Sequence, residues 1–529
     1  MKGRSFHIAL ASTLLFLLLL SSRPASTLAL TDQKLIEKEK VQLPETARFF
    51  PKETSLSLHL MVNPKKIPEY FESTTSTKNK KEARERTENL IEGLFALTGL
   101  DYDKELSRWI SSGVSLAIYQ SNEKNKPYNW LIALPNLNQD ESSIFLERFW
   151  QSRALSGVDI DVSRYRDVGL ISSKNLSNAP IISTALVNNE LLLIASNKEV
   201  LKHSLDISQL SDQNQAGDDG LKSSIQNLDN GLALLTISPL TLNSLFTFPA
   251  KFTQLENFNG LIGSLRTNSE SLILDGFLKF ERPIIDIKSQ EDGISSLIKD
   301  SGGPIESLGV LHSTNTLLEK NSNEPLSIWL GPLIENQLNK TQGLAAKTIL
   351  SSIEGPLICI KEPGGWILGS KKGEPDDSIV DTALKDQIKS KLNYNEQTYE
   401  VWSKLITKRI NNDLKIDTEL GIILAKESEN QWWGETFEAL QQRKENNIEI
   451  LQNQLKELTQ NNNTLPPFQL ALNQRKAQQE ISSWYPWQLL QSVAGKPITP
   501  SIKGLALTIN TDKSIDRNSI NLKASVKFK

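Results

Sequence analysis

The feature that most constrains this fold is a series of short apolar segments that occurs twice in the same order. GVSLAIYQ and NWLIALP lie at residues 113–120 and 129–135, and GPLICIKE and GWILGS lie at 355–362 and 365–370. Trp130 and Trp366 stand at matching places, and the offset between matched positions drifts only from 236 to 244 residues. Loops tolerate insertions better than strands do, so such drift fits two copies of one unit. The sequence predicts an α+β fold of two homologous halves, each a mainly antiparallel sheet with packed helices.

The expected strands and helices are short. In Thr54–Val62, leucine and valine alternate with serine and histidine, as a strand with one buried face requires. Lys78–Thr98 predict a helix with a charged start, and Glu435–Gln460 predict a longer helix with one apolar stripe. The chain then divides into a signal peptide or N-terminal membrane anchor (1–30), a spacer (31–45), a first repeat (46–282), a junction (283–304) and a second repeat (305–529) that contains the long helix near 435–460.

The N-terminus differs in composition from the rest of the chain. Ile8–Leu20 contain no charged residue and follow Lys2 and Arg4. Their length suits the apolar region of a signal peptide and is short for a membrane span. The sequence therefore predicts an exported protein of the periplasm or thylakoid lumen. It leaves open whether residues 8–20 are removed or remain as a membrane anchor.

Composition excludes several classes of protein. The chain has 529 residues, of which 38% are hydrophobic and 23% charged, so it can bury sizeable cores and is not expected to be disordered. Its formal net charge is -3 with both signs interspersed, and we expect no nucleic-acid partner. The single cysteine, Cys359, lies in the apolar run PLICI. We expect it to be a small buried side chain rather than a reactive thiol.

The sequence contains no pattern typical of a catalytic or metal site. None of the four histidines has another histidine, a cysteine or a paired carboxylate at ligand spacing. GGWILGSKKG has the glycine spacing of a phosphate-binding loop, but Ser370 precedes Lys371 and the matching first-half segment lacks glycine. Acidic pairs such as Asp376-Asp377 stand where helices are expected to begin, and there they stabilise the helix. We therefore expect no enzyme activity, no cofactor and no metal.

Aromatic residues cluster in the second half of the chain. Trp432 and Trp433 are adjacent, and Trp484 and Trp487 lie in SSWYPWQLL. Packing in a core or at a domain junction is the favoured interpretation. The alternative is an exposed interface, a membrane contact or a site for an apolar ligand.

Several long phrases resemble a known family. They are FFPKETSLSLHLMVNP, LTGLDYDKELSRWISSGVSLAIY, FLERFWQSRALSGVDIDVSRYRDVGLISS and ALVNNELLLIASNKEVL. They resemble the cyanobacterial proteins that carry domain of unknown function 3352. The resemblance extends over nearly the whole chain after the leader, including QWWGETFEAL. It implies a cyanobacterial exported or membrane-associated protein, and it assigns no catalytic residue.

Two functional hypotheses follow. The first is a non-catalytic exported or membrane-associated protein that serves the envelope or thylakoid as a structural or protein-interaction module. The second is a carrier or binder of lipid or another apolar ligand, because a curved antiparallel sheet with helices can enclose a cavity. The expected partners are thus a protein, a membrane or an apolar ligand.

Overall fold

A computed structural model gives the architecture of most of the chain. It describes residues 42–68, 80–81, 84–85, 88, 91–92, 95, 100–119, 129–174, 181–246, 250–267, 271–284, 294–312, 314–318, 324–339, 350, 352–395, 397–410, 413–444, 449–459, 466–483, 499–511 and 517–528. The predicted leader and most of the predicted spacer lie outside these residues. No helix within the described ranges has both the length and the apolar character needed to cross a membrane.

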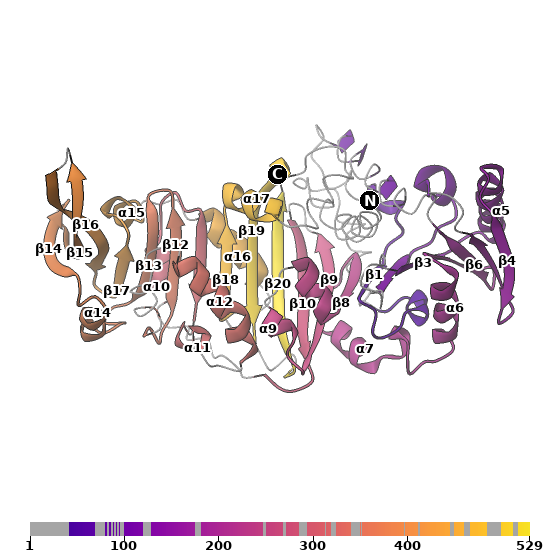
Figure 1. Cartoon of the computed structure of the whole chain (residues 1–529), viewed down its shortest axis with the longest axis horizontal. Coiled ribbons are helices and arrows are strands. Elements are labelled where there is room, and N and C mark those ends of the chain that lie inside the picture. The colour runs from indigo at the N-terminus through magenta and orange to yellow at the C-terminus, as the bar shows by residue number, and fades with distance from the viewer. Residues whose placement is uncertain are drawn as a thin grey trace.

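The described residues form one antiparallel sheet of 20 strands, extended along the long axis of the molecule (Figure 1). Each strand pairs with its neighbours in a continuous order. From one end this order is β4 (Ile160–Tyr165), β5 (Val168–Ser173), β6 (Ser183–Val187), β7 (Leu191–Ala195), β3 (Asn129–Pro135), β2 (Ser115–Tyr119), β1 (Leu56–Leu60), β8 (Ala233–Ile237), β9 (Phe258–Thr267) and β10 (Ser271–Phe280). It continues through β20 (Ser519–Phe528), β19 (Ile502–Asn510), β18 (Phe468–Leu472), β11 (Ser307–Leu311), β12 (Leu357–Glu362), β13 (Gly365–Lys371), β17 (Asn430–Gly434), β16 (Asp413–Lys426), β15 (Gln397–Ile410) and β14 (Ile388–Tyr394).

Helices cover both faces of this sheet. One face carries a large apolar cluster that runs from the α5 end of the sheet to Trp402 on β15. The helices that contribute to this cluster are α5 (Gln139–Leu155), α8 (Pro239–Phe246), α9 (Ala250–Thr253), α11 (Thr314–Leu318), α12 (Pro325–Asn339), α14 (Asp377–Ala383) and the short π-helix η2 (Tyr102–Leu106).

The same face carries a smaller cluster over β18–β20, covered by α17 (Gln474–Ser483). The opposite face carries separate apolar clusters. They are covered by α6 (Lys198–Ile207), α7 (Asp219–Gln226), α10 (Ile294–Lys299), α15 (Phe437–Gln442), α16 (Glu449–Thr459) and the 3-10 helix η1 (Glu45–Phe49). Two further 3-10 turns are η3 (Gln215–Gly217) and η4 (Thr499–Ser501).

The prediction of two homologous halves, each with its own sheet, is wrong. β10 and β20 pair in antiparallel register from Ser271 opposite Lys527 to Lys279 opposite Ser519, and this pairing makes the whole sheet continuous. The physical reason is that β10 and β20 would otherwise be long, apolar edge strands with unpaired backbone groups. Pairing the two edges satisfies those groups, and the architecture is one sheet-rich body with helices on both faces.

The prediction of one helix over 435–460 is also wrong. α15 ends at Gln442, with Arg443 as its C-cap, and α16 begins at Glu449. The apolar stripe is real, since Leu440, Leu451 and Leu455 are buried in the same cluster. A shared stripe on two successive helices gives the same periodic pattern as one long helix, and the break comes from tertiary contacts of Arg443 described below.

Many local predictions are confirmed. Residues 54–62 contain β1, and the described residues between 80 and 95 are helical. The expectation that β1 buries only one face is wrong, because Ser57 and His59 are buried as well as the leucines. Asn188 and Asn189 both have positive φ angles, 51° and 57°, as a tight hairpin turn between β6 and β7 requires. Asp376 is the N-cap of α14, since its carboxylate accepts the N–H of Ser378.

Candidate functional site

Trp432 and Trp433 lie in the middle of β17 and are buried on opposite faces of the sheet. The Trp433 ring packs against Trp402, with ring centroids 6.0 Å apart, and the Trp432 ring packs against the guanidinium of Arg443. For these two residues the hypothesis of an exposed interface or apolar-ligand surface is wrong, and the packing interpretation is confirmed. Trp484 and Trp487 lie outside the described residues.

A glycine creates the space for the Trp432 ring. Gly369 on β13 pairs directly with Trp432, and a Cβ at Gly369 would lie 2.4 Å from the ring. The glycine spacing that resembled a phosphate loop therefore has a packing explanation.

We expect Gly369→Ala to lower the free energy of unfolding by about 1–3 kcal/mol, because the added methyl overpacks a closed core. The same substitution should cost much less in a Trp432→Leu background, where the ring is absent. Equilibrium denaturation of the four variants of this cycle measures the coupling. If Gly369→Ala lowered the unfolding free energy equally in both backgrounds, the Trp432 ring would not be packed against Gly369.

Arg443 is a buried cation with structural partners. Its guanidinium is 3.9 Å from the centroid of the Trp432 ring, bonds the Glu427 carboxylate at 2.5 Å and donates to the carbonyl of Asp300 at 2.6 Å. Burial lowers the pKa of Arg443, and Glu427 opposes that effect. The side chain thus links the end of α15 to the β16–β17 turn and to the residue after α10, which explains why α15 stops there.

His59 forms the centre of a second buried polar network. Its Nδ1 lies 2.8 Å from Ser115 Oγ and its Nε2 lies 3.1 Å from Gln215 Oε1, while Ser115 Oγ also lies 2.6 Å from Thr46 Oγ1. Because the Gln215 oxygen can only accept, the neutral ring carries its proton on Nε2. A Ser–His pair resembles a nucleophile and its base, but both side chains are 0% exposed. No substrate can reach this serine in the folded protein, so the network joins η1, β1, β2 and η3.

Burial lowers the pKa of His59 from 6.5 to about 4, although its bond to Gln215 acts in the opposite direction. The unfolded chain therefore binds more protons than the folded chain between these two values, and stability is lost as the pH falls through this range. We expect this group to destabilise the fold by about 3 kcal/mol between pH 7 and pH 4. Denaturant titrations at both pH values should show this loss in the natural protein and a smaller loss in His59→Asn. If both proteins lost the same unfolding free energy between pH 7 and pH 4, His59 would not be the source of the pH dependence.

A third buried network lies where β10 meets β20. Asp275 and Lys523 face each other in register, with Lys523 Nζ 4.0 Å from the Asp275 carboxylate and 3.6 Å from that of Asp229. Asp275 also accepts the backbone N–H of Asp229 at 2.9 Å and the Asn521 amide at 3.3 Å. Burial raises the pKa of Asp275, while Lys523 acts to lower it. This ion pair holds the two central strands in register.

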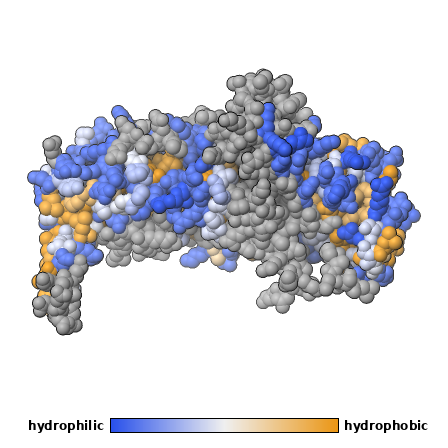
Figure 2. All heavy atoms as spheres, turned by 90° about the horizontal axis from the view of Figure 1, so that it is seen from above, coloured by the Kyte–Doolittle hydropathy of each residue, from blue (hydrophilic) through white to orange (hydrophobic). Residues whose placement is uncertain are grey.

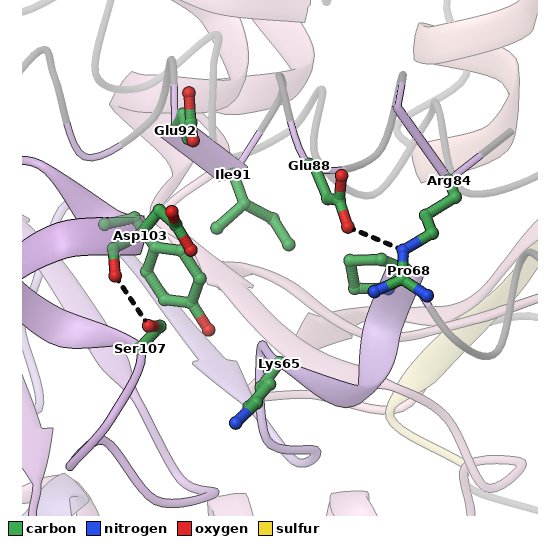
Figure 3. A pocket seen from close by; sticks show the side chains of 9 residues that line it. Lys65, Pro68, Arg84, Glu88, Ile91, Glu92, Asp103 and Ser107 are labelled. Carbon is green, nitrogen blue, oxygen red and sulfur yellow. Dashed lines mark hydrogen bonds and ion pairs between the residues drawn. The ribbon is translucent and has the colours of Figure 1, made fainter. Parts of the chain in front are cut away.

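Two of the pockets that described residues form adjoin η2 and η1. The larger, about 350 Å³, lies between η2 and the described residues near 84–92, and its wall includes Lys65, Glu92 and Asp103 (Figure 3). Arg84 and Glu88 in the same wall form an ion pair of 2.8 Å. The second, about 190 Å³, adjoins η1 and includes Thr46 and Gly113 but not Ser115. Charged and polar side chains contribute to both walls, and neither pocket has the mostly apolar lining of a lipid carrier.

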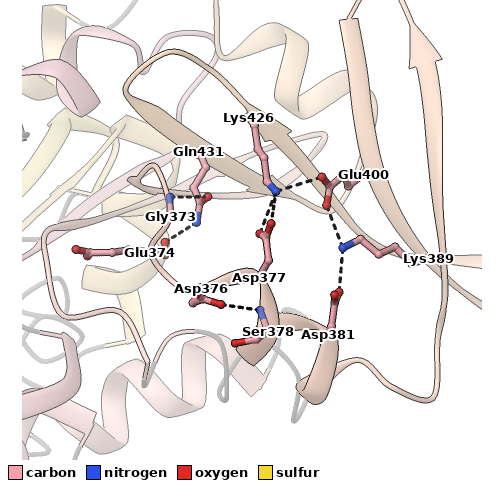
Figure 4. Close-up of polar contacts among 10 residues, drawn as sticks. All are labelled: Gly373, Glu374, Asp376, Asp377, Ser378, Asp381, Lys389, Glu400, Lys426 and Gln431. Carbon is pink, nitrogen blue, oxygen red and sulfur yellow. Dashed lines mark hydrogen bonds and ion pairs between the residues drawn. The ribbon is translucent and has the colours of Figure 1, made fainter.

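An ion-pair network attaches α14 to the last strands of the sheet (Figure 4). Glu400 lies between two lysines, 3.3 Å from Lys389 Nζ and 3.1 Å from Lys426 Nζ. The lysines also bond Asp381 and Asp377 of α14, both within 3 Å. Burial acts to lower the pKa of each lysine, but the bonds to these carboxylates outweigh it and raise the pKa. The network therefore holds the parts of β14, β15 and β16 that lie next to α14, which we call the base of these strands.

Beyond this base, β15 and β16 continue as a two-stranded hairpin that we call the terminal ribbon, Lys404–Ile410 with Asp413–Glu419. The terminal ribbon begins at a β-bulge at Gly421. Trp402 pairs with Ile422 whereas Ser403 pairs with Leu420, so Gly421 has no residue opposite it. Before the bulge, the apolar side chains of Tyr399, Val401 and Trp402 are buried. After it, Leu405, Leu414 and Ile416 are 59%, 74% and 75% exposed.

These three residues share one face of the terminal ribbon. Leu405 pairs with Thr418 and Thr407 pairs with Ile416, so the apolar side chains alternate with threonine on that face. Figure 2 shows apolar atoms at both ends of the molecule, over β14–β16 at one end and near β4 and α5 at the other. Leu155 and Val162 are exposed at the second end. The candidate functional site is the apolar face of the terminal ribbon.

The terminal ribbon was not predicted from the sequence. The signal was available: KLITKRI and LKIDTEL alternate apolar and polar residues on either side of Asn411-Asn412, a favoured hairpin turn pair. Alternation alone does not tell which face is covered, so the exposure of Leu405, Leu414 and Ile416 required the tertiary structure.

Comparison with known proteins adds a family and no activity. No curated protein and no solved structure matches the chain. The model of the family described as protein of unknown function (DUF3352) matches residues 10–524. That match covers almost the entire sequence, and the chain therefore belongs to the DUF3352 family.

Proposed function

We propose that this chain is a non-catalytic interaction protein of an exported or membrane-associated compartment, and that it binds its partner through the terminal ribbon. The observation that carries the proposal is the exposed apolar face formed by Leu405, Leu414 and Ile416. Exposed apolar patches on an ordered element are typical of interaction surfaces.

The structural context supports this proposal. The terminal ribbon pairs only with itself beyond Ser403 among the described residues. A two-stranded hairpin alone is marginally stable in water, and contact with a partner would stabilise it. By contrast, the buried His59, Arg443 and Asp275 networks are enclosed by the fold and have structural partners. The apolar-ligand hypothesis gains no comparable support from the two pockets.

The test compares three full-length proteins in extracts of the cells that make them. The ribbon variant carries Leu405→Ser, Leu414→Ser and Ile416→Thr. The far-end variant carries Leu155→Ser and Val162→Ser, and it is the control that removes exposed apolar side chains from the other end of the molecule. Size fractionation should place the natural protein and the far-end variant in an assembly larger than the free chain, and the ribbon variant as the free chain of 59.2 kDa or its processed form. A natural protein that elutes as the free chain, or a ribbon variant that stays in the assembly, would refute the proposal.

A further inference from the structure

The apolar face of the terminal ribbon continues onto the edge strand β14. Ile388 pairs with Ser403 and Leu392 pairs with Tyr399, so both side chains lie on the same face of the sheet as Leu405. Ile388 and Leu392 are 52% and 45% exposed. We call these two residues, together with the three exposed apolar residues of the ribbon, the end face.

The end face is large enough to form much of the apolar core of a dimer interface. A fully buried leucine or isoleucine removes roughly 100 Å² of apolar surface from water, so the five partly exposed side chains offer about 300 Å² on each copy. A stable interface buries about 800 Å² on each partner, of which roughly half to two-thirds is apolar. The threonines and backbone around the five side chains would supply the polar remainder.

The described charged side chains of the terminal ribbon lie on its other face. Lys404 pairs with Glu419 and Asp417 pairs with Ile406, and neighbouring residues of a strand point to opposite faces. In a two-fold symmetric interface each surface meets its own copy, so a surface with charges of one sign would repel itself. Charged residues are also depleted in the cores of interfaces, and homodimer interfaces are the more apolar ones. The end face has the character that self-association requires.

Large and small side chains alternate on the ribbon part of the end face. Leu405 lies opposite Thr418, and Thr407 lies opposite Ile416. Both threonines are exposed. Two sheets pack face to face when large side chains of one layer fit over small side chains of the other. A second copy, turned about a two-fold axis, can place its leucine and isoleucine over these threonines, so the pattern is complementary to itself.

Pairing between the edges of two β14 strands is a weaker alternative. A symmetric antiparallel pairing centred on β14 would place Lys391 opposite its own copy. Lysines on an edge strand oppose strand addition. Lys389 is also held by Asp381 and Glu400. The edge of β14 is thus protected against a second copy, whereas the end face is open.

We propose that two copies of the chain pack their end faces together as a symmetric dimer in which the two ribbons point in opposite directions. This inference rests on the proposed function and names the partner. The two ribbons form two layers about 10 Å apart, which gives each hairpin the packing that a lone hairpin lacks. Arg409 takes the register position opposite Leu414 at the distal end. Because the distal ends point in opposite directions, the two copies of this position lie far apart.

Sedimentation velocity of the purified full-length protein over a dilution series tests the inference. We expect the natural protein and the far-end variant to dimerise, and the ribbon variant to have a dimer Kd at least about a hundredfold higher. Ile388→Ser with Leu392→Ser should raise the Kd by roughly tenfold. A rise in salt from about 0.05 M to about 0.5 M should leave the Kd of the natural protein nearly unchanged, because the described charges lie outside the interface.

An opposite-face variant is the matched control on the same ribbon. It carries Lys404→Ser and Glu419→Ser, whose side chains are exposed on the face turned away from the proposed interface. This variant should dimerise like the natural protein. If it dissociated as far as the ribbon variant does, the end face would not be the interface.

Spin labels locate the contact between the two copies. A nitroxide at Asp417→Cys, on the outer face of the ribbon, should show dipolar coupling to its copy in the dimer. The same label at Leu155→Cys, at the other end of the molecule, should show none (Figure 1). Cys359 does not interfere, because burial raises the pKa of its thiol to about 12.

The outcomes distinguish this inference from the proposed function. If the purified natural protein stays monomeric, if the ribbon variant dimerises as well as the natural protein, or if the label at position 417 shows no coupling, the dimer is refuted. If the dimer is refuted while the ribbon variant still leaves the cellular assembly, the proposed function stands and the partner is another molecule. If the ribbon variant behaves as the natural protein in both experiments, both proposals are wrong. Unchanged circular dichroism of each variant shows that the exposed substitutions have left the fold intact.

Discussion

Replacing Lys523 by methionine is expected to lower the free energy of unfolding by about 3–5 kcal/mol. Lys523 and Asp275 are both buried, at 7% and 2% exposure, in the pairing that joins β10 to β20. Removing the cation leaves the Asp275 carboxylate without its compensating charge in a region shielded from water. Denaturant titration of the natural and variant proteins measures the loss.

The pH dependence of the stability of Lys523→Met is a second test of the ion pair. The pKa of Asp275 is already raised by burial, and removal of Lys523 takes away an influence that lowers it. A carboxyl whose pKa is higher in the folded state than in the unfolded state favours folding as the pH falls. The cost of Lys523→Met should therefore shrink toward acidic pH. Adding Asp275→Asn to the Lys523→Met protein should recover part of the lost unfolding free energy. The double variant has no unpaired buried carboxylate, and the amide oxygen can still accept the Asp229 N–H.

Lys527→Met provides the matched control on the same strand, since Lys527 is only half-buried. We expect its effect to stay within about 1 kcal/mol. If Lys527→Met and Lys523→Met cost the same, or if Lys523→Met costs nothing, the central ion pair does not stabilise the junction between β10 and β20.

Replacing Trp432 by alanine is expected to cost about 3–5 kcal/mol of unfolding free energy. The ring is fully buried, fills the space opposite Gly369 and stacks on Arg443. Its removal leaves a cavity and uncovers a buried cation. If Trp432 were instead an exposed contact for a partner, the substitution would leave unfolding unchanged.

Tyr394→Ala is the matched aromatic control, because Tyr394 lies at the end of β14 and is exposed. Its ring contacts Phe437, with centroids 5.0 Å apart, so we expect a small loss from this variant. Calorimetric melting of both variants compares the two positions. A Trp432 variant that melts like the Tyr394 variant would contradict the core assignment.

Local features of the fold were predictable because their causes are local. Leucine alternating with Ser57 and His59 marks a strand, Asn188-Asn189 marks a turn, and Asp376 marks the start of α14. Each depends on residues within a few positions along the chain, where backbone preference and side-chain capping act. Cys359 was likewise predictable as an apolar side chain, from the run PLICI alone.

Features that depend on distant partners were not predictable in this way. Packing was the favoured interpretation of the aromatic pair at 432–433, but the residues that enclose it, Gly369, Arg443 and Trp402, do not adjoin it in sequence and could not be identified from it. The stripe in 435–460 looked like one helix, and Arg443 ends the first of two helices by bonding Asp300 and Glu427. The terminal ribbon was missed for the same reason, because the pattern of its strands does not reveal that one face lacks a cover.

By itself the sequence determined which segments become strands and helices and which side chains can enter a core, because hydrophobic periodicity and capping are properties of neighbouring residues. Only the tertiary structure decided that these strands form one continuous sheet. The register of β10 against β20 joins residues about 250 positions apart, from Ser271 opposite Lys527 to Lys279 opposite Ser519. Backbone hydrogen bonding between two apolar edges is available to many strand pairs. Which pair forms depends on packing and on the buried charges of Asp275 and Lys523, and these come together only when the whole chain is folded.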